Sequence, residues 1–277
     1  MLRHFFVAVC CLISLPLLAS NTLPLNDQKS LDLLEPSILR LFYASPSQGD
    51  IPVTPKDPAR FIETLKPVDG LDQINGGSYW LYAKIRNDSD NNHWVLDPYD
   101  SVIDTLHVYF FKPEGVEQHS VGHLYPQPYS LSYGVDLSLA PDQQAEVLIF
   151  IESRHFSGTP RIEIKSQADY MSWRVIQNSL VIGCFGAIIA LAFYNLFIGI
   201  SMRDKSYLYY SAYLVVSLVA WAAVFNALAE WFSIHSYHLL IPPFFLTVLF
   251  NTLYFIHFLE LPKNHPRLTR FCYSFSG

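Results

Sequence analysis

Cysteine is scarce in this 277-residue chain, and none of its four cysteines lies between residues 21 and 172. Two of them, Cys10 and Cys11, lie near the N-terminus, Cys184 lies in an apolar run, and Cys272 lies near the C-terminus. A scaffold held by disulfides is therefore excluded for region 21–172. That region has about 150 residues, which is long enough to bury a hydrophobic core without disulfide bonds.

Acidic residues are nearly absent from residue 173 onward, where only Asp204, Glu230 and Glu260 occur. Roughly seven-tenths of this segment is apolar or aromatic, and a surface in water could hardly accommodate that composition. Region 21–172, in contrast, carries 21 Asp and Glu against 11 Lys and Arg. Its negative charge suits a soluble domain and makes nucleic acid a poor partner. The chain thus divides into a soluble half and a half that belongs in lipid.

The soluble half also lacks the common patterns of catalytic chemistry. It contains no βαβ pattern, no Gly-rich phosphate loop, no nucleophile elbow and no cysteine nucleophile. Its histidines are scattered, and His119 and His123 lie in a stretch whose glycines predict a loop. The sequence therefore predicts no catalytic residue, no metal site and no cofactor, and we expect the protein not to be an enzyme.

The first 20 residues predict a secretory signal peptide. A basic start at Arg3 is followed by an apolar run, and the small residues Ala19 and Ser20 close the segment. The alternative is an uncleaved membrane anchor. Both interpretations export the region that follows, residues 21–172.

Three apolar segments follow in region 173–277 and predict membrane-spanning helices at about 176–200, 207–228 and 238–261. Each has roughly 20 residues or more, enough to cross a hydrocarbon core of about 30 Å. One such segment could be the buried helix of a soluble enzyme. Three in succession, joined by short linkers, favour a transmembrane region.

The orientation follows from the basic residues, which mark cytoplasmic loops. These residues are Arg203 and Lys205 in the first linker, and Lys263, Arg267 and Arg270 after the third span. The second linker, "AEWFSIHSY", contains neither Lys nor Arg. The sequence thus predicts an exported N-terminal domain and a cytoplasmic first linker, in which Asp204 or Ser206 would cap the second helix.

Polar residues within the predicted spans allow two interpretations. They are Asn195, Asn226, Asn251, His257 and Glu260. Amides in lipid commonly pair with neighbouring helices, whereas ionisable groups such as His257 and Glu260 can also mark an ion or proton path. The last two are three residues apart and would share one face of a helix.

The exported half shows alternating polar and apolar residues in short runs, at 79–86, 101–111, 145–153 and 160–166. Gly, Pro, Asn and Asp residues bound these runs, as is typical of strands joined by turns. The pattern predicts an antiparallel β-sandwich, with the jelly roll as the favoured variant.

Aromatic residues in the predicted connections are the candidate ligand-binding residues of the exported half. They are Trp94, Tyr99, Tyr125, Tyr129 and Tyr133. Exposed rings offer flat apolar faces to sugars or other amphipathic small molecules. The alternative is that these rings cover the ends of the sandwich core.

The order of these parts, together with two groups of residues, resembles a known family. Residues 193–214, "FYNLFIGISMRDKSYLYYSAYL", join the first two spans, and "YWLYAKIRNDSD" is followed by "WVLDPYDSVIDTLHVYFF" and "GVEQHSVGH" in the exported half. These stretches resemble the bacterial seven-transmembrane receptors with diverse intracellular signalling modules. The resemblance implies a jelly-roll sensory domain similar to carbohydrate-binding modules, located in the periplasm, and helices in the cytoplasmic membrane.

The same resemblance implies the function. Such a receptor binds a small ligand, which could be a carbohydrate, and passes a signal through its helices to a cytoplasmic module such as a diguanylate cyclase or a histidine kinase. This chain ends after three predicted spans, so we expect it to be a truncated form. The alternatives are a membrane-tethered module that binds a protein partner in the periplasm, and a transporter or enzyme that uses His257 and Glu260.

Overall fold

A computed structural model describes most of the chain. The described residues are 22–27, 30–34, 41–44, 55–72, 74–99, 103–123, 125, 128–154, 156, 161–239 and 241–265. The predicted signal peptide at 1–20 and two predicted topology residues, Arg267 and Arg270, lie outside them.

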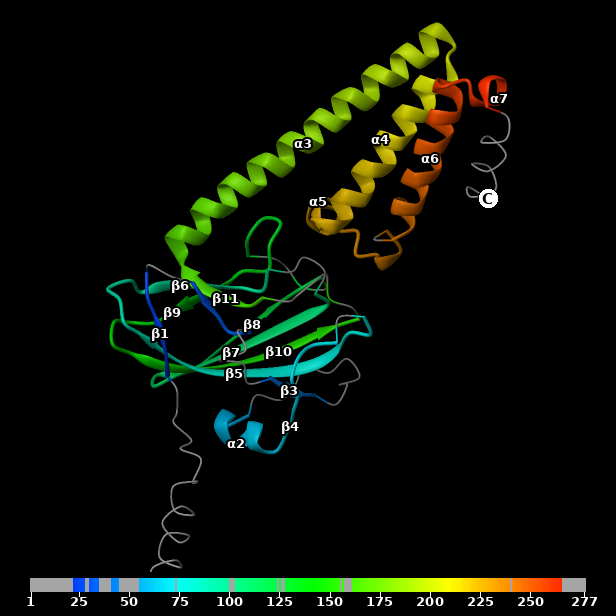
Figure 1. The fold of residues 1–277 in the computed structure, drawn as a ribbon. Helices are drawn as coiled ribbons and strands as arrows, with labels where there is room; N and C mark the ends of the chain where they lie inside the picture. Colours follow the sequence, from blue (N-terminus) through cyan, green and yellow to red (C-terminus); the bar gives the residue numbers. More distant parts are fainter. Residues whose placement is uncertain are drawn as a thin grey trace, which may run out of the picture.

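The larger of two sheets has seven strands (Figure 1). They are β1 (Thr22–Leu25), β3 (Leu41–Tyr43), β4 (Lys66–Pro67), β5 (Gly77–Asn87), β7 (Thr105–Lys112), β8 (Gly115–Val121) and β10 (Gln144–Ser153). The order is β4-β3-β5-β10-β7-β8, with β1 also paired to β5. That pairing is parallel, whereas the other pairs of described strands in this sheet are antiparallel.

The smaller sheet has four antiparallel strands in the order β2-β11-β6-β9. They are β2 (Leu31–Asp32), β6 (His93–Asp97), β9 (Val135–Ser138) and β11 (Glu163–Ser166). The main core is formed by apolar side chains of both sheets, such as Ile85 and Ile149 from the larger sheet and Leu96 and Ile164 from the smaller. The predicted β-sandwich is confirmed, and its jelly-roll variant stays a prediction.

A second, smaller core covers the opposite face of the larger sheet. Helix α2 (Pro58–Glu63) begins after Asp57, whose side chain accepts a hydrogen bond from the Arg60 N–H at 3.1 Å. Ile62 of this helix packs in one cluster with Trp80 and Phe150. This layer explains why β5 and β10 are apolar on both faces, which departs from a strict alternation.

The four predicted strands correspond to β5, β7, β10 and β11, but the other seven described strands, β6 and β8 among them, were not predicted. Trp94 therefore lies in a strand and not in a connection, and the predicted loop around His119 is the strand β8. Strand β8 lies at the edge of its sheet and is largely exposed. An exposed edge strand carries polar residues on both faces, so its sequence shows little alternation.

The helical half begins directly after the last strand. Its helices are α3 (Gln167–Met202), α4 (Lys205–Val224), α5 (Ala227–Phe232), the 3-10 helix η1 (Tyr237–Leu239), α6 (Pro242–Phe258) and α7 (Leu261–Asn264). Among the described helices, α3 and α4 are long and apolar enough to cross a membrane. With 17 residues, α6 is equally apolar but shorter, at the lower limit for a span.

The helix boundaries differ from the predicted spans at three places. The first helix starts at Gln167 and not near 176, because Ser166 caps it by accepting the Asp169 N–H at 3.2 Å. The second span ends at Val224, because Asn226 adopts a left-handed conformation with φ of 59°, which asparagine tolerates better than most residues. The third helix starts at Pro242 instead of 238.

The basic residues of the first linker lie at the end of the helices that is remote from the sandwich, and Lys263 of α7 lies at the same end (Figure 1). Asp204, one of the two residues predicted for this role, caps α4 by accepting the Ser206 N–H at 2.8 Å. With the sandwich outside the membrane, the positive charges lie on the cytoplasmic side, as expected for Arg203 and Lys205.

Apolar side chains of the helices face outward along most of their length. Phe197 on α3 and Phe245 on α6 are each 72% exposed. An apolar helix surface of this kind is stable in lipid and not in water.

Candidate functional site

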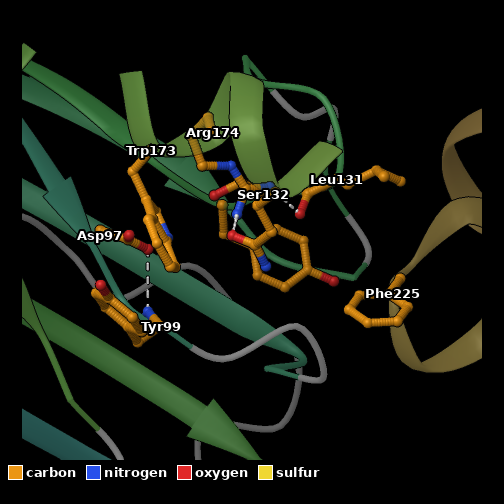
Figure 2. A pocket seen from close by; sticks show the side chains of 9 residues that line it. Asp97, Tyr99, Leu131, Ser132, Trp173, Arg174 and Phe225 are labelled. Carbon is orange, nitrogen blue, oxygen red and sulfur yellow. Dashed lines mark hydrogen bonds between the residues drawn. The ribbon is translucent and has the colours of Figure 1, made fainter. Parts of the chain in front are cut away.

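A cleft of about 250 Å³ lies at the junction between the sandwich and the helices. Its lining residues are Asp97, Tyr99, Leu131, Ser132, Tyr133, Trp173, Arg174, Gln177 and Phe225. They come from the end of β6, from the connection that precedes β9, from the second and third turns of α3, and from the end of α4 (Figure 2). This volume is slightly below that of typical ligand pockets and suits a small molecule.

Two aromatic rings line the cleft and remain accessible. Tyr99 is 45% exposed and Trp173 is 50% exposed, and both line the cleft together with Asp97 (Figure 2). On the sandwich side, the Lys165 ammonium lies 4.4 Å from the centre of the Tyr99 ring, within range of a cation–π interaction. The Tyr99 ring is thereby held in place.

Asp97 is a buried carboxylate in the wall of the cleft. It accepts a hydrogen bond from the Tyr99 N–H at 3.1 Å, and its second oxygen lies 3.7 Å from the Lys165 Nζ. Burial raises the pKa of Asp97, although Lys165 and Arg174 act in the opposite direction. Burial lowers the pKa of Lys165, but Asp97 and Tyr99 outweigh it, so that this pKa is raised overall.

Arg174 is also buried and holds the segment 130–131 against the first turns of α3. Its Nη2 donates to the carbonyl oxygen of Ser130 at 3.0 Å and to that of Leu131, and its Nη1 donates to the Gln177 side chain at 2.9 Å. Asn178, one turn further along α3, donates to the same Ser130 carbonyl at 3.2 Å. Two side chains of one helix thus bind the backbone of a sandwich loop.

The same segment is bound by α5 from the other side. The Glu230 carboxylate accepts the Ser130 hydroxyl at 2.7 Å and the Leu131 N–H at 2.6 Å. Hydrogen bonds to a carboxylate are stronger than those between neutral groups. Residues 130–131 therefore connect α3 to α5 through the sandwich, and we call them the bridging segment.

The Leu131 side chain inserts between the helices. Its backbone is left-handed, with φ of 54°, which is unfavourable for a non-glycine residue and persists only when surrounding contacts fix it. The side chain packs in one cluster with Val181 and Phe185 of α3 and with Ala222 and Ala227 of α4 and α5.

A second contact joins the sandwich to the break between α4 and α5. The His123 Nδ1 donates to the Asn226 Oδ1 at 3.1 Å, and the His235 Nδ1 donates to the His123 carbonyl at 2.7 Å. Burial lowers the pKa of His123 and outweighs its bond with Asn226, which acts in the opposite direction.

The predicted aromatic residues fall into different environments. Trp94 is 1% exposed and belongs to the main core, as does Tyr133, whose ring only closes one wall of the cleft. Tyr129 packs on Tyr170 and donates to Asp136, and Tyr125 packs on His107. Of the five, Tyr99 is the accessible one in the cleft.

The predicted intramembrane polar residues are likewise dispersed. The Asn195 Nδ2 donates to the Leu191 carbonyl of its own helix, and the expected pairing between helices stays a prediction for this residue. Asn226 pairs with the sandwich, while Asn251 is half-buried on α6.

His257 and Glu260 do not share a helix face. The His257 ring packs on Tyr209 of α4, at 4.8 Å between ring centres. Helix α6 ends at Phe258, and the left-handed Glu260 precedes α7 and lies 3.4 Å from Lys263. Pro262 explains this end, because it cannot donate the N–H that a continuing helix needs.

Sequence reasoning missed Asp97, Trp173, Arg174 and Glu230. One local signal was present, because the capping pattern of Ser166 and Asp169 places the helix start well before the apolar run. The helix start would have placed Trp173 and Arg174 beside the sandwich. No local pattern indicates that Glu230 meets residues about 100 positions earlier.

Comparison with known proteins gives two family matches. Residues 50–160 match a model described as 7TMR-DISM extracellular 2, and residues 177–277 match a model described as 7TM diverse intracellular signalling. No curated protein matches the chain. Among solved structures, the Se-Met labelled beta-glucosidase from Kluyveromyces marxianus is 15% identical over 46% of this chain and 16% of its own, with a TM-score of 0.25. A TM-score this low carries no argument.

Proposed function

The chain belongs to the family of seven-transmembrane receptors with diverse intracellular signalling, and on that premise we propose that its junction cleft binds the sensed ligand. The function is binding and not catalysis. A small polar ligand would lie against Tyr99 and Trp173 and reach Asp97 and Gln177. A carbohydrate fits the flat rings, and the cleft volume limits it to about one sugar unit.

One observation carries this proposal: the cleft lining contains Leu131 of the bridging segment and Arg174, which binds that segment. Leu131 lines the cleft and inserts between the helices, and Arg174 lines the cleft and holds the bridging segment. A ligand that contacts either side chain changes the free energy of the bridging contact. It can therefore shift the equilibrium between two arrangements of α3 and α5, provided that it binds them unequally.

The route of the signal follows from the helix connections. The bridging segment binds Glu230, which lies one turn after the break at Asn226. A break in a helix can act as a hinge. We place the sandwich in the periplasm and the output at the remote, basic end of the helices, where a cytoplasmic signalling module would respond.

Hydrogen–deuterium exchange on the full chain in lipid nanodiscs tests this function. The chain is exposed to millimolar monosaccharides and amino acids, and exchange is followed in segments 128–133 and 225–234. We expect a bound compound to change exchange in both segments. Trp173→Ala should abolish the change, whereas Phe245→Ala, which alters an exposed ring outside both the cleft lining and the two segments, should not.

Two outcomes would contradict the proposal. If no compound of either class binds, the cleft is not the sensory site. If a compound binds in the cleft and both segments exchange as before, the bridging segment does not carry the signal.

A further inference from the structure

We infer that the ligand of the junction cleft is a zwitterion with an amine and a carboxylate close together, as in a free α-amino acid. This inference rests on the proposed function and names the chemical class of the sensed molecule. Its basis is a pair of buried, oppositely charged side chains in one small cleft, Asp97 and Arg174.

The two charges are built into the walls. Asp97 is 5% exposed and Arg174 is 9% exposed, and both line the cleft. Buried charges are energetically costly unless each has a partner. A charged side chain on the surface can turn toward water. Asp97 and Arg174 cannot do so without losing their contacts with the strands and helices around them.

Each of the two groups keeps bonding capacity. The Asp97 oxygen that faces Lys165 is 3.7 Å from its Nζ, which exceeds hydrogen-bond length. The Arg174 Nη1 carries two N–H groups, of which one donates to Gln177. An ammonium in the cleft can therefore still donate to Asp97, and a carboxylate can accept from the second N–H of the Arg174 Nη1.

Size and shape restrict the rest of the ligand. A space of about 250 Å³ holds roughly eight waters, each with a share of about 30 Å³. One amino acid or one sugar unit fills it. The exposed faces of Tyr99 and Trp173 offer an apolar surface for one hydrocarbon or aromatic side chain.

A zwitterion matches this cleft better than a neutral sugar. Its ammonium would add a charge-assisted hydrogen bond to Asp97, which otherwise faces the Lys165 Nζ at 3.7 Å, and its carboxylate would add one to Arg174. A sugar hydroxyl can bond to either group, but it brings no charge of its own to the bond. Sites of this kind reject analogues that lack one of the paired groups, because a buried group is then left unpaired.

Calorimetric titration of the full chain in nanodiscs tests the inference. The probes are the standard L-α-amino acids, D-glucose and D-galactose, and matched analogues of each binder. For L-phenylalanine these are phenethylamine, which lacks the carboxylate, and 3-phenylpropanoic acid, which lacks the amine. We expect at least one amino acid to bind and both of its analogues to bind at least about 100-fold more weakly.

Asp97→Asn is the matching variant, because it keeps the shape of the side chain and removes its charge. It should weaken binding of the amino acid by about 10-fold or more, while Asp136→Asn, at an exposed residue of the adjacent strand, should leave binding unchanged. Thermal unfolding of both variants shows whether they are folded.

The possible results distinguish a failure of the zwitterion inference from a failure of the sensory cleft. Binding of a monosaccharide without any amino acid overturns the zwitterion and leaves the sensory cleft in place. Equal affinity for an amino acid and its amine or acid analogue, or unchanged binding by a folded Asp97→Asn variant, also overturns it. Absence of binding by every probe overturns both proposals.

Discussion

The sandwich and the helical half use the same apolar residues in opposite ways. In the sandwich, Ile85, Val108 and Ile149 are fully buried between the sheets. On the helices, large side chains such as Phe197 and Phe245 face outward. The first half excludes water by its own packing, whereas the second depends on lipid. The junction between them is held by polar contacts, and it contains the candidate site.

The largest contrast is expected between matched truncations in the two halves. Ile149→Ala should lower the free energy of unfolding of the sandwich by about 3 kcal/mol, since it leaves a cavity in a close-packed core. Phe197→Ala on the outer face of α3 should change it little. Denaturant unfolding of the full chain in nanodiscs, followed by a probe in the sandwich, measures both. Equal losses would show that this division of the molecule is wrong.

The polar junction should respond to loss of the Glu230 carboxylate. Glu230→Ala removes two hydrogen bonds to residues 130–131 and should weaken the bridging contact by about 2 kcal/mol. Faster hydrogen exchange at the Leu131 N–H reports the loss. Glu260→Ala, at an exposed carboxylate near the remote end of the helices, is the control and should not alter this exchange.

The junction around the buried His123 should lose stability in acid, although protonation leaves its Nδ1 donor to Asn226 in place. Burial lowers the pKa of His123 below its ordinary value of about 6.5. The folded state therefore disfavours protonation, and its stability is retained above that value and falls as the pH drops below it. Besides Asn226, the groups that act on this ring are His235 and Asp104.

Melting temperatures measured from pH 8 to pH 5 test this dependence. His123→Gln should flatten the decline below pH 6.5, and His93→Gln, an exposed histidine of β6, should not. An unchanged slope in the His123 variant would assign the decline to other groups.

The smallest effect is expected inside the helical half. The Ser211 hydroxyl of α4 donates to the Ala192 carbonyl of α3 at 2.9 Å, whereas Asn195 bonds within α3. Ser211→Ala should reduce helix packing by about 0.6 kcal/mol, a typical value for hydrogen bonds between membrane helices. Asn195→Ala should cost less, because its bond does not join helices. Unfolding in mixed micelles compares the two, and the reverse order would contradict this assignment.

Much of the architecture follows from local sequence patterns. Alternation predicted four strands of the sandwich, long apolar runs predicted the helices, and Asp204 was one of two candidate caps. The edge strand β8 was not predicted, because an exposed strand lacks the alternation of polar and apolar residues. The helix break at Asn226 was not predicted, because an asparagine in an apolar run can also continue a helix.

The candidate site was less predictable. Tyr99 and Trp94 are both aromatic residues from one region of the sequence, yet Tyr99 borders the cleft and Trp94 lies in the core. Burial depends on what packs against a side chain, and sequence spacing does not contain that information. The same holds for Arg174, which resembles an interfacial anchor until the bridging segment is seen to lie against it.

The sequence by itself determined the division into an exported domain and a membrane region, the strand-rich character of the first, the orientation of the second and the family. The first three properties follow from composition, periodicity and charge, which are local or additive along the chain, and the family follows from the resemblance of particular stretches of sequence. The tertiary structure alone decided that Asp97, residues 130–131, Arg174 and Glu230 meet at one junction. Contacts between residues so far apart depend on how sheets and helices pack, and no short stretch of sequence encodes that packing.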